Sequence, residues 1–385
     1  MALRFLESSG TGADLPSLIL TLKKRFPGAL PKHLSLAAEM YAARRQAPAK
    51  LGAWASQGYF SLAVLQQASR ACVAAARARH FAGCRHVLEI GTGSACDTAA
   101  LARVSGHVTS IECDEATAIL ARRNLELLGI ANATVLVGDA QTLVPAALER
   151  CDALFADPAR RTPEGERIFR PEDYSPPLSW VMELPVRGIR AIKISPGLFV
   201  EPPPGWARQF VGVGAECLEQ TLWHGAAVDD SSVLLADLGV EWGARPLQPA
   251  LPAAEELRGY LCEAHGAVNR SQRLAEFFAE HGVRRVADDV AYGISPGAPG
   301  RSPLISAFRI ISEGPLKVSD LRASLVRLGW SNRTEIKKRS VNVDPEQLRR
   351  ELSLREHSHE AEFGVVFLFP WRGKPWCVLC ERECD

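Results

Sequence analysis

An acidic side chain and two glycines, Glu89, Gly91 and Gly93, stand close together where a short apolar run ends. Glycine at both positions lets the backbone approach a ligand where a Cβ atom would clash, and the helix expected next offers unpaired N–H groups. Dinucleotide-binding turns use this place for a pyrophosphate and carry a third glycine, in the pattern G-x-G-x-x-G. Here Cys96 stands at the third position. Glu89 would repel a pyrophosphate but attract a ligand that carries an ammonium and a sulfonium.

Three further acids come at the ends of the next three apolar runs: Glu112, Asp139 and Asp157. A carboxylate at the position of Glu112 can accept hydrogen bonds from both ribose hydroxyls. Asp139 can accept from an adenine amino group, while the N–H of Ala140 donates to a ring nitrogen. Taken singly, Glu89 is as readily a surface acid, and Asp139 is more readily a helix N-cap. As an ordered set at the carboxyl ends of consecutive strands, the acids predict a nucleoside site.

The elements that position these residues are short apolar runs that alternate with helical stretches. Helices are expected at Asp97–Val104 and Glu115–Leu128, and strands at Val87–Ile90, Val108–Ile111, Thr134–Val137, Ala153–Ala156, Ile189–Ile194, Glu216–Trp223 and Val233–Leu238. This alternation predicts the α/β class, with a Rossmann-like seven-stranded sheet that is mostly parallel and has helices on both faces. About nine residues join the last two strands. That is too few for a helical crossover, so an antiparallel pair is expected there.

The composition divides the chain into three regions. Residues 1–86 carry apolar residues at three- and four-residue steps, which predicts a helical region broken at Pro27, Pro31 and Pro48. Residues 87–242 hold the predicted sheet, and a proline-rich stretch follows. Residues 256–385 are expected to form a small α+β domain, with helices near Ser271–His281, Val318–Leu328 and Asp344–Leu352 and strands near Leu304–Ile311 and Phe363–Phe369.

Over about Leu62–Gly239, the glycine loop and its acids resemble a class I S-adenosylmethionine-dependent methyltransferase. The resemblance implies S-adenosylmethionine as the cofactor. Seven residues would then contact it: Glu89, Gly91, Gly93 and Asp97 at its methionine part, Glu112 at the ribose, and Asp139 and Ala140 at the adenine. Ala95 replaces a glycine that is commoner in such loops, and it is nearly as small.

The segment Asp157-Pro158-Ala159-Arg160-Arg161 follows the fourth predicted strand. Methyltransferases that act on amines carry an acid or amide, two prolines and an aromatic residue here. The acid or amide accepts N–H bonds, so that the nitrogen lone pair points to the methyl group. The likeness makes Asp157 the main positioning residue, with Pro158 beside it. Arg160 and Arg161 either contact a phosphate or base of the substrate or pair with acids of this acidic segment.

Two nearby segments lie on the expected substrate side of the sheet. Tyr174 and Trp180 flank a pair of prolines, and they are either stacking residues for a base or part of a rigid loop over the core. Lys193, near the end of the fifth predicted strand, is expected only to pair with a nearby acid.

The D-P-A-R-R loop, the Ser175-Pro176-Pro177 segment and the C-terminal stretch 334–349 together resemble a narrower family. These are bacterial methyltransferases with a C-terminal THUMP-like domain, distantly related to the RNA-cap guanine-N2 methyltransferases. The likeness extends over most of the chain. THUMP domains bind the acceptor end of tRNA, so the resemblance implies RNA as a partner, although such domains usually precede the catalytic domain and this one follows it.

Four basic residues, Arg333, Lys337, Lys338 and Arg339, lie near Trp330 in a predicted loop-to-strand stretch. Cations beside an aromatic ring suit a phosphate backbone and an unstacked base. A solvated edge strand blunted by lysine gives the same pattern. The charge distribution favours RNA, because +9 over residues 1–86 and +6 over 301–355 enclose −10 over 87–255, within a total of +1. Solvated Arg-rich helices that keep the protein soluble explain the same balance.

Neither a membrane span nor a metal site is expected. No stretch of the 385 residues approaches the ~20 apolar residues that cross a bilayer, and none has the pattern of a secretory signal. The 10 cysteines lack framework spacing, which predicts a reducing, cytoplasmic location. Cys377 and Cys380 form one C-x-x-C in an expected terminal strand. With only Cys384 and the distant His357 and His359 to add, they do not complete a zinc site.

The leading hypothesis is an enzyme that transfers a methyl group from S-adenosylmethionine to a base nitrogen in structured RNA. One alternative is a methyltransferase that acts on a small molecule or a protein. Another is an RNA-binding protein with an inactive methyltransferase fold. A nicotinamide-dependent reductase is disfavoured by Glu89 and by the missing third glycine. The sequence predicts neither the target base nor the oligomeric state.

Overall fold

The computed structural model describes residues 1–160, 166, 168–243, 249–354, 356 and 364–382. The chain divides into two compact units. The first holds residues 1–213 and 218–241, and the second holds residues 214–217 and 242–385.

The first unit begins with helices, as the apolar spacing of residues 15–86 predicts. They are α1 (Ala2–Ser9), α2 (Leu15–Arg25), α3 (Pro31–Gln46), α4 (Pro48–Leu51), α5 (Leu62–Gln67) and α6 (Ala71–Ala78), with the 3₁₀ helices η1 (Ala53–Ser56) and η2 (Arg79–Phe81). Prolines stand in the first turns of α2, α3 and α4, where the backbone needs no N–H donor. The stretch Leu62–Phe81 is helical as expected but is interrupted at residues 68–70.

A sheet of nine described strands forms the centre of the first unit, in the order β3-β2-β1-β4-β5-β7-β6-β8-β9. The strands are β1 (His86–Ile90), β2 (His107–Glu112), β3 (Ala133–Val137), β4 (Ala153–Ala156), β5 (Arg190–Ile194), β6 (Trp206–Val213), β7 (Glu216–His224), β8 (Ser232–Leu235) and β9 (Val240–Trp242). β1 to β5 pair in parallel, and β7 runs antiparallel to β5. The α/β class and the parallel methyltransferase-like sheet are confirmed, while the expected seven strands become nine.

The far end of this sheet differs from the expectation. A strand that the apolar pattern did not indicate, β6, lies between β7 and β8, so these two do not form the expected antiparallel pair. β8 pairs in parallel with β6, with Phe210 opposite Val233. The physical reason is the connection between β6 and β7, residues 214–215, which is shorter than the connection between β7 and β8, residues 225–231. A two-residue link makes β6 and β7 a hairpin, and the longer link then crosses β6.

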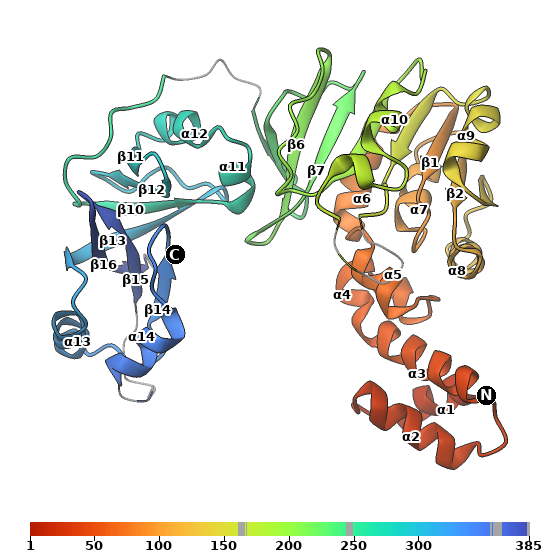
Figure 1. Ribbon diagram of the computed structural model, residues 1–385, viewed down its shortest axis with the longest axis horizontal. Coiled ribbons are helices and arrows are strands. Elements are labelled where there is room, and N and C mark those ends of the chain that lie inside the picture. The colour runs from red at the N-terminus through yellow and green to blue at the C-terminus, as the bar shows by residue number, and fades with distance from the viewer. Residues whose placement is uncertain (161–165, 167, 244–248, 355, 357–363, 383–385) are drawn as a thin grey trace. The chain divides into compact units, whose positions relative to one another are not determined.

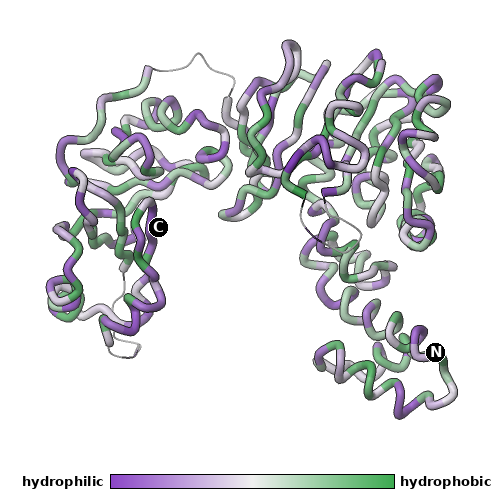
Figure 2. Tube along the Cα trace, viewed as in Figure 1, coloured by the Kyte–Doolittle hydropathy of each residue, from purple (hydrophilic) through white to green (hydrophobic). Residues whose placement is uncertain are grey.

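Helices cover both faces of the sheet (Figure 1): α7 (Cys96–Ala102), α8 (Glu115–Leu127), α9 (Ala140–Leu148) and α10 (Leu178–Glu183), with the short 3₁₀ helix η3 (Pro171–Asp173). Successive strand residues point to opposite faces, and each face has its own core. Val87 and Ala153 pack with α6 and α7 on one face, while Leu88 and Leu154 pack with α9 and α10 on the other. The hydrophobic colour of Figure 2 therefore runs along the strands, and this burial holds the strand ends in place.

The second unit has a sheet of seven described strands, in the order β11-β12-β10-β13-β16-β15-β14. Its elements are β10 (Tyr260–Ala264), α11 (Gly266–Arg270), α12 (Leu274–Glu280), β11 (Arg284–Ala287), β12 (Val290–Ser295), β13 (Ile305–Pro315), α13 (Val318–Arg327), β14 (Glu335–Lys338), α14 (Pro345–Leu352), β15 (Val365–Trp371) and β16 (Lys374–Arg382). Its expected helices and both expected strands are present, so the C-terminal α+β domain is confirmed. The sequence analysis did not indicate β10, β11 and β12, which are only four to six residues long.

Among the described residues, no helix is both long and apolar enough to span a membrane.

Candidate functional site

A cavity of about 740 Å³ opens at the carboxyl ends of the parallel strands in the first unit. Ligands of open α/β sheets bind in this crevice. Its wall includes most of the residues expected from the sequence for the cofactor and the reaction: Gly91, Gly93, Asp97, Glu112, Asp139, Ala140, Asp157, Pro158 and Arg160. The N-terminal helical region also contributes, through residues 49–50 and 66–70. That contribution was not predicted.

The turn after β1 brings the glycine loop against the end of β4. Gly91 has a φ of +91°, and a Cβ atom on it would lie 2.7 Å from the carbonyl oxygen of Asp157. The N–H of Gly91 donates to the carbonyl of Ile111 in β2 at 2.9 Å. Glycine alone combines an unstrained positive φ with the absence of a Cβ atom at this close contact. Gly91 therefore allows the ends of β1, β2 and β4 to lie in contact.

Ala95, in place of the commoner glycine, ends the same loop in a left-handed conformation. Its φ is +64°, and it is buried at the start of α7. This conformation costs about 1–2 kcal/mol for a residue with a Cβ atom. The methyl group packs with Ala99 and Ala118. The small side chain of Ala95 thus fits between the loop and the helices α7 and α8.

Glu89 is fully buried in β1 and is not among the residues that line the cavity. It accepts a hydrogen bond from Thr98 Oγ1 at 2.5 Å. Burial raises the pKa of Glu89 to about 8. At neutral pH the folded chain therefore holds this carboxyl mainly in its protonated form. The negative charge expected from Glu89 is supplied instead by acids on the cavity wall.

Glu112 and Asp139 stabilise the loop and a helix start while they face the cavity. Glu112 Oε2 accepts from the N–H of Gly93 at 2.9 Å, and its Oε1 accepts from the N–H of Asp114 at 3.1 Å. Asp139 is the N-cap of α9, where its Oδ2 accepts from the N–H of Thr142 at 2.9 Å. The capping role and a ligand role for Asp139 are thus compatible, because the cap uses only one carboxylate oxygen.

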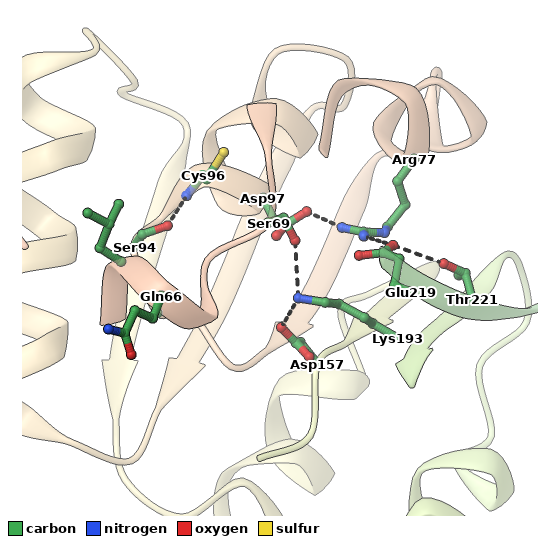
Figure 3. Close-up of polar contacts among 12 residues, drawn as sticks. Gln66, Ser69, Arg77, Ser94, Cys96, Asp97, Asp157, Lys193, Glu219 and Thr221 are labelled. Atoms are coloured by element: carbon green, nitrogen blue, oxygen red, sulfur yellow. Dashed lines mark hydrogen bonds and ion pairs between the residues drawn. The ribbon is translucent and has the colours of Figure 1, made fainter. Parts of the chain in front are cut away.

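Lys193 and Asp157 form an ion pair across the ends of β5 and β4 (Figure 3). Lys193 Nζ lies 2.7 Å from Asp157 Oδ2 and donates to Ser69 Oγ at 3.2 Å. The Lys193 side chain is 5% exposed and that of Asp157 is 24% exposed. The sequence predicts a pairing of Lys193 with a nearby acid. The structure adds that this acid is the expected reaction residue and that both line the cavity.

Arg77 of α6 joins two other acids of the cavity wall, Asp97 of α7 and Glu219 of β7 (Figure 3). It is buried, and its guanidinium lies 4.6 Å from the centre of the Phe155 ring. Burial alone would lower the pKa of Arg77, but the two carboxylates together raise it, so the group stays charged. Arg77 and Glu219 were not predicted, because neither lies in the strand–loop–helix pattern that marks the cofactor loop.

Lys50, in α4, is an unpredicted cation that lines the cavity itself. Its Nζ donates to the carbonyls of Leu65 and Gln66, each at 2.8 Å. Burial lowers the pKa of Lys50 to about 8, with help from the charges of Lys193 and Arg70. The four-residue helix α4, with the sequence Pro-Ala-Lys-Leu, gives no sequence signal for this role.

The expected substrate residues of the first unit have different positions. Arg160 is half-buried on the cavity wall, and its carbonyl accepts from the N–H of Ile168 at 2.8 Å. Arg161 lies outside the described residues. Tyr174 is buried in the core beneath α10, with Trp180 packed against the same cluster. Ser175 and Pro176 of this segment line the cavity, whereas Tyr174 is not exposed for stacking.

The four expected basic residues of the second unit divide into two pairs. Lys337 and Arg339 both pair with Glu263, and Lys337 also lies over the faces of two buried phenylalanines. These contacts tie β14 to β10. Arg333, Lys338 and Arg339 are all exposed, but only Arg339 of these three pairs with Glu263. The pair Arg333 and Lys338 is therefore the better placed for a polyanion.

The two cysteines of the C-x-x-C motif lie in the core of the second unit. Cys377 and Cys380 are buried in β16. In the part of the chain that the structure describes, no group of three or more His, Cys, Asp or Glu side chains is placed to hold a metal ion. Cys384, His357 and His359 lie outside the described residues.

Comparison with known families agrees with this geometry. A family model described as THUMP domain-like matches residues 305–382. A model described as protein-L-isoaspartate(D-aspartate) O-methyltransferase matches residues 67–148. The second match contains the glycine loop, Glu112 and Asp139, and it ends before Asp157.

Relatives extend the comparison over most of the chain. Two S-adenosylmethionine-dependent methyltransferases of Mycobacterium tuberculosis, from strains CDC 1551 and H37Rv and described as uncharacterized, are 29% identical over 325 residues. Each match covers 81% of this chain and 87% of the relative. A protein-L-isoaspartate O-methyltransferase of Magnetococcus marinus is 50% identical over 54 residues, which are 14% of this chain and 24% of that protein.

A solved structure shows the same fold. It is the crystal structure of a provisionally assigned methyltransferase from Porphyromonas gingivalis W83, which matches 100% of this chain and 98% of its own at a TM-score of 0.77 and 18% identity. The chain is an S-adenosylmethionine-dependent methyltransferase with a C-terminal THUMP-like domain.

Proposed function

We propose that this methyltransferase acts on structured RNA. The observation that carries the proposal is the THUMP-like region, residues 305–382, in the same chain as the methyltransferase sheet. The charge of +6 over residues 301–355 and of +9 over residues 1–86 supports a polyanionic partner. Arg333 and Lys338 are exposed cations of the second unit that fit this role.

The cavity residues fit S-adenosylmethionine, whose sulfonium supplies an activated methyl group. A Cβ atom on Gly93 would meet nothing within 4 Å, so the backbone of the loop is open to a ligand. We assign the ribose to Glu112, the adenine to Asp139 and Ala140, and the methionine part to the loop with Asp97. Carboxylates at these places suit a ligand with hydroxyl, amino and ammonium donors.

Asp157 and Pro158 are the residues that we assign to the acceptor. In the proposed function, Asp157 and a backbone carbonyl hold the acceptor group of the RNA by hydrogen bonds; the base nitrogen is the acceptor expected from the sequence of the Asp157-Pro158 loop. The enzyme then acts mainly by positioning and by excluding water. Since Asp157 Oδ2 already accepts from Lys193, Oδ1 is the oxygen left for an acceptor group.

Methylation of a protein is the second candidate, because the O-methyltransferase family model matches residues 67–148. That stretch contains the cofactor loop but not the β4 and β5 ends where an acceptor would lie. The match therefore supports the cofactor more than it supports a protein substrate.

Incubation of the full chain with tritiated S-adenosylmethionine and total RNA from cells that lack the protein tests the proposal. We expect tritium in RNA, and RNA binding that weakens steeply between low and physiological salt. Tritium in a protein extract but not in RNA would favour the second candidate. RNA binding without any transfer would indicate an inactive methyltransferase fold.

A cytoplasmic location belongs to the same proposal. The nine described cysteines are all free thiols, which suits a reducing compartment.

A further inference from the structure

We propose that the methyl acceptor is a hydroxyl oxygen, the ribose 2′-hydroxyl of an RNA strand, held between Lys193 and Asp157. The inference rests on the proposed RNA substrate and replaces the base nitrogen as the acceptor atom. Three properties of the cavity carry it: the donors and acceptors that the ion pair leaves open, the charge beside the acceptor position, and the pairing of the surrounding acids.

The Lys193–Asp157 pair offers one donor and one acceptor at the same place. An ammonium has three N–H donors. Lys193 directs two of them to Asp157 Oδ2 at 2.7 Å and Ser69 Oγ at 3.2 Å, which leaves one for a ligand. Asp157 keeps Oδ1 as an acceptor. Both side chains line the cavity, so the open donor and acceptor are within reach of a ligand.

A hydroxyl group matches this pair with a single atom. Its oxygen accepts from the Lys193 ammonium and donates its proton to the Asp157 carboxylate. The exocyclic amine of a base only donates, because its lone pair is delocalised into the ring. An unprotonated ring nitrogen only accepts. Within an RNA strand, the ribose 2′-hydroxyl is the internal hydroxyl that can be presented in this way.

The charge of Lys193 also distinguishes oxygen from nitrogen. A nitrogen that gains a methyl group gains positive charge in the transition state, and an ammonium beside it would repel that charge. A hydroxyl oxygen that loses its proton as it attacks carries partial negative charge, and the same ammonium stabilises it. The cavity therefore favours an oxygen acceptor.

Apart from Asp157, no acid among the described residues forms an ion pair with Lys193. Asp97 and Glu219 pair with Arg77, which is buried between them (Figure 3). The Lys193 side chain is 5% exposed and lines the cavity, so an acceptor there meets its ammonium and the Asp157 carboxylate as a pair.

The transfer step balances with these two residues. The hydroxyl oxygen forms the O–CH₃ bond with a lone pair as the C–S bond breaks, and the pair of that bond stays on sulfur as a neutral thioether. The hydroxyl proton passes to Asp157 Oδ1 and then to solvent. No oxidant, reductant or metal ion is needed.

The position of the label in RNA tests the inference. Total RNA from cells that lack the protein is incubated with the full chain and tritiated S-adenosylmethionine, and is then hydrolysed in alkali. A 2′-O-methyl group blocks cleavage at its own phosphodiester bond, so we expect tritium in alkali-resistant dinucleotides and in 2′-O-methyl nucleosides. Tritium in mononucleotides with a methylated base would overturn the oxygen acceptor while the RNA function stands. No tritium in RNA would overturn both.

Variants of the pair separate catalysis from binding and folding. We expect Lys193→Met to lower transfer to RNA about 100-fold, with Lys193→Arg closer to the natural chain. The affinity for S-adenosylhomocysteine, measured by calorimetry, should stay within about twofold for both, because the proposal does not place Lys193 at that ligand. The exposed Lys23→Met is the matched control. Equal losses of cofactor affinity and transfer in Lys193→Met would contradict the role at the acceptor.

Discussion

The Glu112 carboxylate accepts a hydrogen bond from the backbone N–H of Gly93 at 2.9 Å, so that the end of β2 is tied to the glycine loop after β1. The same carboxylate is the group that we assign to the ribose. Glu112→Ala should therefore lower the affinity for S-adenosylmethionine at least tenfold, because a ligand contact and a loop contact are lost together. Equilibrium dialysis with the labelled cofactor measures this. Glu126→Ala, a change of an exposed residue in α8, is the control. Equal affinities of the two variants would contradict the assignment of the ribose to Glu112.

Asp139 caps α9 and also faces the cavity, and these two roles can be separated. Asp14 makes the same N-cap contact in α2, to the N–H of Ser17 at 3.0 Å, but does not line the cavity. Asp139→Ala and Asp14→Ala each remove one cap. We expect only Asp139→Ala to weaken cofactor binding, by about tenfold. Unchanged binding in Asp139→Ala would mean that the residue is a cap and no more.

Gly91 and Gly93 provide a matched pair for the loop geometry. Alanine at Gly91 would bring a Cβ atom to 2.7 Å from the carbonyl oxygen of Asp157, whereas alanine at Gly93 would meet nothing within 4 Å. Both glycines have positive φ, so both changes carry a backbone cost of about 1–2 kcal/mol. Gly91→Ala should lower the free energy of unfolding by about 2 kcal/mol more than Gly93→Ala does. Chemical denaturation of both variants checks the difference, and equal losses would contradict the close contact.

Glu89 gives the stability of the folded chain a specific pH dependence. Burial raises its pKa from 4.5 to about 8. The folded chain thus binds this proton more tightly than the unfolded chain, and the contribution is greatest below pH 4.5 and is lost as the pH rises towards 8. Glutamine has nearly the shape of a protonated glutamate and does not ionise. Glu89→Gln should therefore abolish this pH-dependent loss in the free energy of unfolding. Denaturation curves from pH 4 to 9, without cofactor, compare the two chains. Parallel profiles would show that Glu89 is ionised in the folded state.

The exposed cations Arg333 and Lys338 should contribute to RNA binding independently of stability. Replacing both with alanine is expected to flatten the slope of log affinity against log salt by about 1–2. Lys337→Ala should instead lower the melting temperature, because Lys337 pairs with Glu263 inside the second unit. Filter binding to total RNA at several salt concentrations measures the slope. If the double variant leaves the slope of log affinity against log salt unchanged, Arg333 and Lys338 belong to a solvated strand edge that does not bind RNA.

The part of the site that could be predicted lies in local strand–loop–helix units. Glu112 ends β2, and Gly91 and Asp139 follow β1 and β3 within two residues, so parallel pairing of these strands brings the three together. The order of acids along the sequence therefore becomes an order in space. For the same reason, Asp157 could be expected at the end of β4.

The rest of the site depends on packing between distant segments. Arg77 and Lys50 come from the helical region before the sheet. Nothing in their local sequence shows that Arg77 will pair with acids of the cavity wall or that Lys50 will line the cavity. Lys193 was expected to pair with an acid, but its partner follows from the pairing of β4 with β5. β6 was missed because a polar pair, Arg208 and Gln209, interrupts its apolar pattern.

Titration of the full chain with S-adenosylhomocysteine in a calorimeter tests the central claim most directly. The account predicts binding of one molecule per chain, at an affinity that Glu112→Ala lowers, and no binding of a nicotinamide dinucleotide at the same concentrations. Absence of heat with S-adenosylhomocysteine and with S-adenosylmethionine, on protein shown to be folded, would contradict the assignment of the cavity.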